Sequence, residues 1–200
     1  MIRQDEIALV INSQRESFQH QDYGVKRDAL ASIPIADSFA TIITGIRRCG
    51  KSTLMLQLLR RDYKEAIYLN FDDIRLSGFD TGDFNRLHKE IERSNIKVLF
   101  FDEIQIVTGW ETFINQLLRE GYKVFITGSN ASMLSSELGT HLTGRHLSME
   151  LFPFSYSEFI GLRNIDNNHQ AVMSYLKTGG IPEYIKSGLP VILNTLVDDI

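Results

Sequence analysis

A short segment near residue 50 combines the residue types with which proteins hold a phosphate group. Gly45, Gly50, Lys51 and Ser52 are spaced as G-x-x-x-x-G-K-S, between an apolar run and a segment of helical periodicity. Glycines at this spacing permit a turn whose backbone N–H groups point inward, and the following helix adds its positive end. Lys51 would neutralise the β- and γ-phosphates, while the Ser52 hydroxyl would bind Mg²⁺. A glycine turn with a solvated lysine is the alternative. The pattern predicts nucleotide contacts from Gly45, Ile46, Arg47, Arg48, Cys49, Gly50, Lys51, Ser52 and Thr53.

Two adjacent carboxylates, Asp102 and Glu103, follow the apolar run 98–101. They would lie at the same sheet edge as the phosphate loop, because the carboxyl ends of parallel strands meet there. In this Walker B pattern, Asp102 would hold Mg²⁺, and Glu103 would orient and polarise the water that attacks the γ-phosphate. A solvated strand end is the alternative. Glutamate at position 103, in a sequence without an Asn-Lys-x-Asp segment to read guanine, favours ATP over GTP.

A third apolar run, 124–127, is followed by Gly128, Ser129 and Asn130. In hydrolytic P-loop proteins of this layout, the strand between the two motif-bearing strands places a polar side chain beside the γ-phosphate and the attacking water. Ser129 or Asn130 would fill this sensor role. Either side chain would equally well cap a helix beginning near Ala131, so both interpretations stay open.

These motifs require a sheet that brings the ends of several strands together. Short apolar runs predict core strands at 39–44, 66–71, 97–102, 123–127 and 146–151. Helical patterns lie between them at 51–61, 83–93 and 110–120, and further helices are expected at 155–162, 167–177, 182–186 and 190–200. The alternation predicts an α/β fold with a parallel five-stranded sheet between helices. We expect a P-loop ATPase core with an N-terminal helical segment over residues 1–154, and a partial helical lid over 155–200.

Composition and charge exclude several other classes of protein. Of the 200 residues, 43% are hydrophobic and 23% are charged, as in ordinary globular proteins and unlike disordered chains. A formal net charge of −4 does not support a nucleic-acid partner, which would need a local basic patch. No apolar run approaches the ~20 residues of a membrane span, and the chain begins with carboxylates where a signal peptide is apolar. We expect a cytoplasmic protein without a membrane partner.

The motifs occur in an order that resembles one family. They are Gly-Ile-Arg-Arg-Cys-Gly-Lys-Ser at 45–52, Phe-Phe-Asp-Glu-Ile-Gln at 100–105, Ile-Thr-Gly-Ser-Asn at 126–130, Leu-Thr-Gly-Arg at 142–145, Leu-Phe-Pro-Phe-Ser-Tyr-Ser-Glu-Phe at 151–159, and Gly-Gly-Ile-Pro-Glu at 179–183. The series is similar to the prokaryotic AAA+-like ATP-binding proteins, whose P-loop domain precedes a poorly characterised C-terminal domain. The resemblance implies the AAA+ strand order 5-1-4-3-2. It also implies a longer protein, because family members generally exceed this length and the last helical pattern has no stop signal.

The same resemblance gives a role to Arg145. In AAA+ proteins, a Gly-Arg pair just before the last core strand supplies an arginine finger to the nucleotide of a neighbouring subunit, and Gly144-Arg145 stands at that place. This role implies a homo-oligomer, whereas a salt bridge with a carboxylate such as Glu150 is the alternative. The segment 179–183 would place a lid helix near the nucleotide, with Lys186 as a weak substitute for the arginine usual in lids.

Cys49 is the single cysteine of the chain. It precedes the expected helix N-terminus and stands near Arg48 and Lys51, an environment that lowers the pKa of a thiol. Redox control of the loop follows only if the side chain is exposed, and an inert small side chain is the alternative.

Together the motifs predict a Mg²⁺-dependent ATPase that binds ATP and ADP and couples hydrolysis to conformational change. The residues expected to take part in catalysis are Lys51, Glu103, Ser129, Asn130 and Arg145, and those expected to bind the metal are Ser52 and Asp102. The first alternative is an ATP-dependent switch or binding module with little turnover, which Glu103 opposes. A small-molecule kinase would need an acceptor pocket and an arginine-bearing lid, and the Asp-Glu pair disfavours it.

Overall fold

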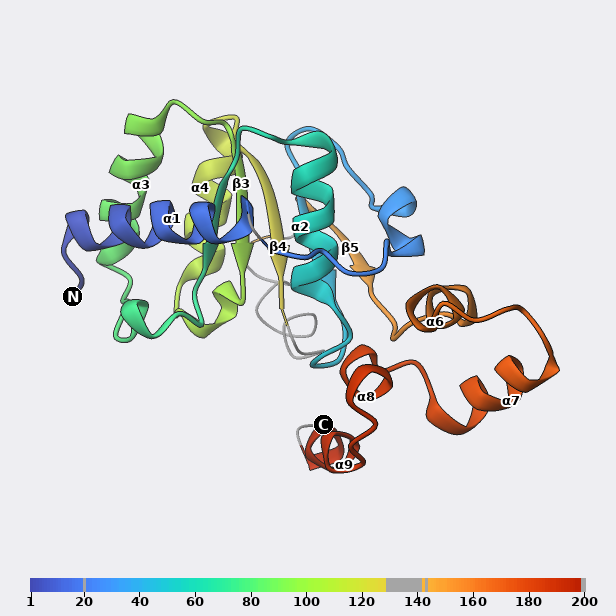
Figure 1. Ribbon diagram of the computed structural model, residues 1–200. Coiled ribbons are helices and arrows are strands. Elements are labelled where there is room, and N and C mark those ends of the chain that lie inside the picture. Colours follow the sequence, from blue (N-terminus) through green and yellow to red (C-terminus); the bar gives the residue numbers. More distant parts are fainter. Residues whose placement is uncertain (20, 129–141, 143, 199–200) are drawn as a thin grey trace.

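A parallel five-stranded sheet forms the centre of the computed structural model, which describes residues 1–19, 21–128, 142 and 144–198 (Figure 1). The strands are β1 (Ala40–Thr44), β2 (Ile67–Asn70), β3 (Val98–Asp102), β4 (Lys123–Thr127) and β5 (His146–Glu150). Their spatial order is β2-β3-β4-β1-β5, with parallel pairing throughout. This is the predicted order 5-1-4-3-2 counted from the other edge, so the predicted fold class is confirmed.

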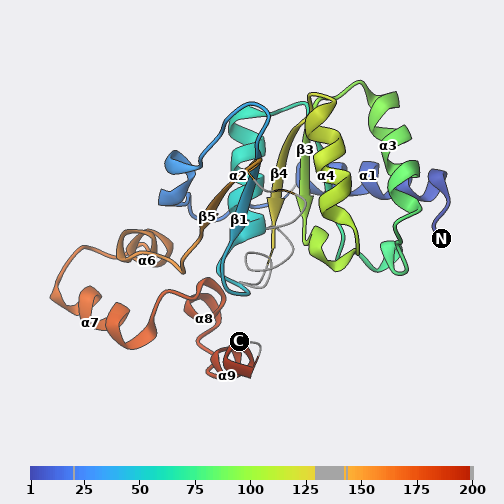
Figure 2. The ribbon, with the colours of Figure 1, turned by 180° about the vertical axis from the view of Figure 1, so that it is seen from behind.

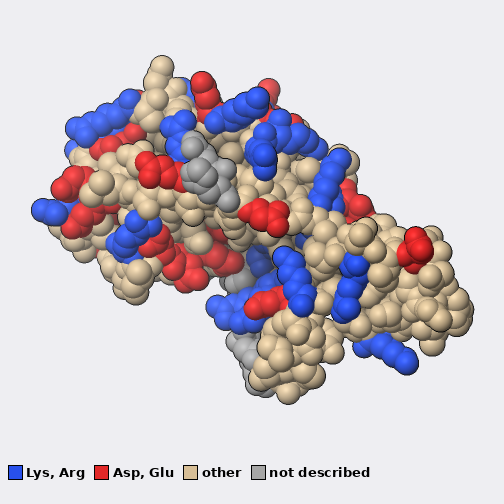
Figure 3. Space-filling view, in the orientation of Figure 1, with Lys and Arg blue, Asp and Glu red and all other residues tan. Residues whose placement is uncertain are grey.

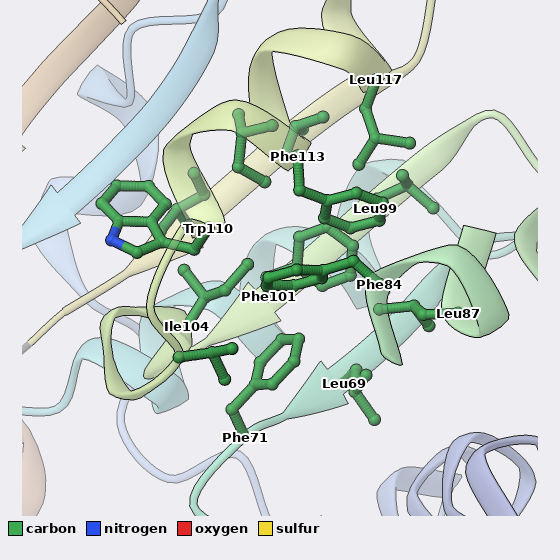
Figure 4. Packing of buried hydrophobic residues seen from close by; sticks show 14 of the residues in the cluster. Leu69, Phe71, Phe84, Leu87, Leu99, Phe101, Ile104, Trp110, Phe113 and Leu117 are labelled. Carbon is green, nitrogen blue, oxygen red and sulfur yellow. The ribbon is translucent and has the colours of Figure 1, made fainter. Parts of the chain in front are cut away.

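The sheet is covered on both faces because alternate strand residues point in opposite directions. On one face, Phe100 and Phe125 stack with ring centroids 4.6 Å apart, under helix α2 (Lys51–Asp62). On the other face, Phe101 of β3 meets Phe84 of α3 (Asp83–Ser94) and Phe113 of α4 (Trp110–Arg119) in one buried cluster (Figure 4). Figures 1 and 2 show α2 and α4 on these two opposite faces. The strand ends are thereby fixed between two packed layers.

The N-terminal helix α1 (Gln4–Gln19) lies along the edge strand β2. Its Gln14 side chain accepts a hydrogen bond from the backbone N–H of Asn70 at 2.8 Å and donates to the Asn70 carbonyl at 3.3 Å. The amide of Gln14 therefore pairs with the strand as a neighbouring strand would, which satisfies backbone groups that an edge leaves unpaired. Ile7 and Val10 of α1 are buried in the cluster that also holds α3.

Four described helices follow the sheet (Figure 1). The first two extend beyond its β5 edge, and the last two lie below the loop that joins β1 to α2. They are α6 (Tyr156–Arg163), α7 (His169–Thr178), α8 (Pro182–Ser187) and α9 (Val191–Asp198). Helix α6 begins with a capping box in which the Ser155 hydroxyl accepts from the Glu158 N–H and the Glu158 carboxylate accepts from the Ser155 N–H. The helices expected after residue 155 are all found, although the predicted end at Ile200 lies outside the described residues. Within the described residues, no helix combines the length and apolar character needed to cross a bilayer.

Candidate nucleotide-binding site

The loop between β1 and α2 has the tight conformation that its two glycines predict. Gly45 and Gly50 have φ values of +146° and +98°, where side chains are strained. A Cβ on Gly45 would also lie 2.3 Å from the backbone oxygen of Leu151, so no larger residue fits there. Arg48 adopts φ +62° within the same loop. The backbone thus turns sharply from the end of the strand into the start of α2.

Lys51 lies across this loop. Its side chain is buried, and its ammonium group donates hydrogen bonds to the carbonyl oxygens of Gly45 and Ile46, each at 3.0 Å. Both partners are neutral carbonyls, so within the part of the chain that the structure describes no anion compensates the positive charge. The charge is therefore held where the loop would receive a phosphate group.

A cavity of about 540 Å³ opens beside the loop, within the size range of small-ligand sites. Its wall combines the loop and first turn of α2 with residues that follow β2 and β3 and with the start of α8. The lining residues are Arg47, Arg48, Gly50, Lys51, Ser52, Thr53, Asp72, Glu103, Gln105, Ile106, Pro182, Glu183 and Lys186. Figure 3 shows Lys and Arg side chains gathered where the core meets helices α8 and α9. The cavity therefore joins the predicted loop, the predicted base and the predicted lid.

Asp102 lies fully buried at the end of β3, behind the cavity wall. The hydroxyl of Tyr68 donates to its Oδ2 at 2.7 Å, and the hydroxyl of Thr127 donates to its Oδ1. Burial, with the nearby Asp102 carboxylate, raises the pKa of Tyr68 well above its usual value, so the phenol keeps the proton that it donates. Within the described residues, the carboxylate has these neutral donors and no cationic partner. Such an anion suits a divalent cation.

Glu103 follows directly and lines the cavity. Its backbone has φ +55°, its N–H donates to the Thr127 hydroxyl at 3.3 Å, and its carboxylate accepts a hydrogen bond from Gln105. The left-handed backbone turns the chain away from the strand after Asp102. As a result, the two adjacent carboxylates occupy different environments, one buried and one open to the cavity.

Among the described residues, an ion pair joins the lid to the loop. The guanidinium of Arg48 donates to the Glu183 carboxylate at 3.0 Å, and both side chains are about half exposed. Pro182 and Glu183 lie at the start of α8, and Lys186 is one turn later on the same helix. Sequence reasoning expected the segment 179–183 near the nucleotide, and the structure places its last two residues in the cavity wall.

Arg145 lies at the opposite end of the sheet from the loop. It precedes β5, and its carbonyl accepts from the N–H of Ala40 at the start of β1, whereas Thr44 at the end of β1 pairs with Glu150. The exposed Arg145 side chain donates to Asn115 at 3.4 Å. The expected alternative, an ion pair with a carboxylate such as Glu150, is wrong for Glu150, because the two residues stand at opposite ends of one strand, ~16 Å apart at a strand rise of ~3.3 Å.

Two other predictions have different outcomes. Cys49 is fully buried, and burial raises the pKa of its thiol, so the expected lowered pKa is wrong. The exposure that redox control would need is absent, and the alternative of an inert small side chain holds. The candidate sensors Ser129 and Asn130 lie outside the described residues.

Tyr68 and Thr127 contact Asp102 but were not singled out from the sequence. Thr127 could have been found from the sequence, because it is a polar residue at the end of an inner strand, and inner strands of such sheets are otherwise apolar. Tyr68 lacks such a signal, because tyrosine is common in strands and its partner is 34 positions away.

Comparison with known proteins identifies relatives and a fold. A family model described as an AAA domain matches residues 37–160. Uncharacterized protein MJ1544 of Methanocaldococcus jannaschii is 37% identical over 163 residues, covering 79% of this chain and 36% of the relative. An uncharacterized protein of Haemophilus influenzae is 35% identical over 181 residues, covering 81% of this chain and 45% of the relative. The chain therefore spans less than half the length of these relatives.

Solved structures with a similar fold have much lower sequence identity. AMPPCP-bound DnaA from Aquifex aeolicus matches with a TM-score of 0.50 and 14% identity, over 82% of this chain and 57% of that one. Hsp104 of S. cerevisiae, in its casein complex, matches with a TM-score of 0.53 and 18% identity, over 77% of this chain and 31% of that one. These likenesses show a shared fold.

Proposed function

Because this chain belongs to the AAA domain family, a family of AAA+-like P-loop ATPases, we propose that it binds ATP in the described cavity and hydrolyses it with Mg²⁺. Hydrolysis would be coupled to movement of the helices after residue 155. The observation that carries the proposal is the composition of one cavity wall. Lys51 and Ser52 from the loop, Glu103 from the end of β3, and Glu183 from α8 all line it. Phosphate binding, water activation and lid contact would thus share one space.

Ser52 and Asp102 would hold the metal ion. The fit rests on the Asp102 carboxylate, which is buried with only hydroxyl donors among the described residues and so lacks a compensating positive charge. When bound, Mg²⁺ would neutralise charge on the phosphate oxygens. Tyr68 and Thr127 would orient the carboxylate, since each donates to a different oxygen of Asp102.

The phosphate loop would bind the β- and γ-phosphates through backbone N–H groups and the Lys51 ammonium. Glu103, which is open to the cavity, would orient the attacking water and accept its proton. Gln105 donates to the Oε2 of this carboxylate, so the water would bind at Oε1. Ser129 or Asn130 would complete the site as a sensor.

That same hydrogen bond favours a second candidate, an ATP-dependent switch or binding module with little turnover. While Gln105 donates to Glu103, part of the carboxylate is unavailable to water. A switch would therefore retain ATP for long periods, whereas an ATPase would release phosphate repeatedly.

Phosphate release from ATP and Mg²⁺, without a phosphate acceptor, separates these candidates. The ATPase predicts many turnovers per molecule, and the switch predicts ATP retained at a one-to-one ratio. Glu103→Gln should keep ATP affinity and lower turnover by about 10²- to 10⁴-fold, because the general base is lost. Lys51→Ala should weaken ATP binding at least about tenfold, because the main cation at the phosphates is lost.

Two exposed neighbours outside the cavity, Lys64 and Glu65, provide matched controls. Lys64→Ala and Glu65→Gln make the same chemical changes and should leave both measurements unchanged. Equal turnover of the wild-type protein and Glu103→Gln would remove the base assignment, and failure of the wild-type protein to bind ATP would remove the function.

A further inference from the structure

Arg27 is a buried arginine that contacts three separate segments of the chain. Only 2% of its surface is exposed. Its Nη1 donates to the carbonyl of Cys49 at 2.6 Å, its Nη2 donates to the carbonyl of Phe152 at 2.8 Å, and its Nε donates to Glu158 at 2.7 Å. One rigid guanidinium therefore joins the phosphate loop, the connection after β5, and helix α6.

The contact with Cys49 fixes the direction of a neighbouring N–H group. In a planar trans peptide, the carbonyl of one residue and the N–H of the next point in opposite directions. Because the Cys49 carbonyl points at Arg27, the N–H of Gly50 must point away from Arg27, and Gly50 is one of the residues that line the cavity. A Cβ on Gly50 would lie 2.8 Å from the Arg27 Nη1, so the guanidinium rests directly against the loop. Arg27 thereby directs one loop donor inward.

The contacts with the lid are equally buried. Glu158, whose side chain is 3% exposed, accepts from the Arg27 Nε and from the N–H groups of Asp28 and Ser155. The ring of Phe154 lies 4.8 Å from the guanidinium carbon of Arg27. Movement of the start of α6 would therefore strain the same group that holds the loop.

Lysine does not reproduce this arrangement. An ammonium group is a single point on a flexible chain, whereas the planar guanidinium fixes several donors in set directions. Arg27 has three acceptors in three directions, and loss of any one would leave a buried polar group unsatisfied. The site therefore requires the geometry of the arginine guanidinium as well as its positive charge.

We propose that Arg27 is a positioning residue that holds the phosphate loop in its phosphate-binding conformation and links that conformation to the position of α6. The proposal rests on the proposed function, since it concerns ATP bound in the same cavity. Arg27 acts through the Cys49 carbonyl and does not contact the nucleotide.

Arg27→Lys tests the first half of the proposal, with binding of ATP and of inorganic tripolyphosphate as readouts. Both affinities should fall at least about tenfold per folded molecule, because the weakened element is the phosphate cradle, which both ligands share. KM for ATP should rise more than kcat falls. Arg61→Lys is the control, because Arg61 is exposed and donates to the Leu30 carbonyl and to Asp62 outside the cavity. If Arg27→Lys loses stability but binds both ligands as tightly as the wild type, the proposal is overturned.

Hydrogen–deuterium exchange of the wild-type protein tests the second half and does not depend on the folding of a variant. Addition of ATP should slow amide exchange in α6 as well as in the loop, and leave α4 unchanged. Protection of the loop without protection of α6 would overturn the link. If the wild-type protein binds no ATP, the proposed function itself fails; if it binds ATP and Arg27→Lys binds equally well, only this inference fails.

Discussion

Asp102 depends on two hydroxyl groups that come from the strands on either side of it. Tyr68 of β2 and Thr127 of β4 each donate to one carboxylate oxygen, so the carboxylate plane is fixed between two neighbouring strands. A buried carboxylate held in this way loses little side-chain conformational entropy when it binds a cation. The orientation of Asp102 is thus a property of residues that do not line the cavity.

Tyr68→Phe should raise the Mg²⁺ concentration needed for half-maximal ATP hydrolysis by about tenfold, because Asp102 loses one of the two donors that orient it. The ring contact with Phe18, at a centroid distance of 4.1 Å, is retained by phenylalanine. ATP binding without Mg²⁺ should not change. A titration of Mg²⁺ at saturating ATP measures the effect.

Tyr63→Phe is the matched control, because the Tyr63 ring packs on the same face of the sheet, 5.9 Å from Phe100. It should leave the Mg²⁺ titration unchanged. Identical titrations for Tyr68→Phe and the wild type would show that the phenol does not position Asp102.

Sequence patterns predict the site residues that belong to a contiguous motif. Lys51 and Glu103 stand in contiguous motifs, and both line the cavity. Arg27 and Tyr68 belong to no such pattern. Their partners lie 22 to 131 positions away, so only the folded chain brings these groups together.

The segments 151–159 and 179–183 contact one another in the lid. The N–H of Phe154 donates to the carbonyl of Gly180 at 2.7 Å, and the hydroxyl of Tyr175 donates to the Phe154 carbonyl at 2.7 Å. A Cβ on Gly180 would lie 2.3 Å from the Phe154 carbonyl oxygen. Glycine at 180 thus allows the connection before α6 and the connection before α8 to lie in backbone contact.

Gly180→Ala should separate these two connections and destabilise the lid by about 1–3 kcal/mol, since the methyl group meets backbone that cannot rotate away. Gly161→Ala makes the same substitution within α6, where the new Cβ would lie 3.8 Å from Val25 in ordinary contact. It should stabilise the helix by about 0.5–1 kcal/mol. Urea unfolding, with hydrogen exchange of α7 and α8, measures both effects. Equal and small changes in the two variants would contradict this account of the contact.

The secondary-structure elements follow closely from sequence patterns where burial is complete. All five strands lie within one residue of their predicted limits. For the inner strands β1, β3 and β4 the reason is that buried parallel strands are continuous apolar runs between polar turns. Helix α1 was expected only as an N-terminal helical segment. Its place beside β2 depends on contacts such as Gln14 with Asn70, which are 56 positions apart and leave no local pattern. The division of the chain at residue 154 remains a prediction.

Across the whole molecule, Arg145 and the phosphate loop stand at opposite ends of the sheet. Arg145 cannot reach the cavity of its own chain from the start of β5. Its proposed role as an arginine finger therefore requires a second copy whose loop lies against this end of the sheet. Its present partner, Asn115, is a neutral group that it can leave at little cost.

Arg145→Ala should lower turnover far more than ATP affinity, because the fixed positive charge acts on the transition state. Hydrolysis per molecule should rise with protein concentration. Mixing Arg145→Ala with Lys51→Ala should restore part of the activity, since one partner keeps the arginine and the other keeps an intact loop. Flat activity across concentration together with inactive mixtures would show that Arg145 does not act on a neighbouring copy.

The opposite placement of Arg145 and the loop also sets the symmetry of any such assembly. Donor and acceptor are different patches, so the contact is heterologous, and until a ring closes each added copy still leaves one loop free at one end. An open chain of copies therefore contains one site that no arginine completes, whereas a closed ring contains none. In short assemblies that terminal site is a large fraction of all sites. The activity per molecule would then depend on whether the ring closes, and not only on how many copies associate.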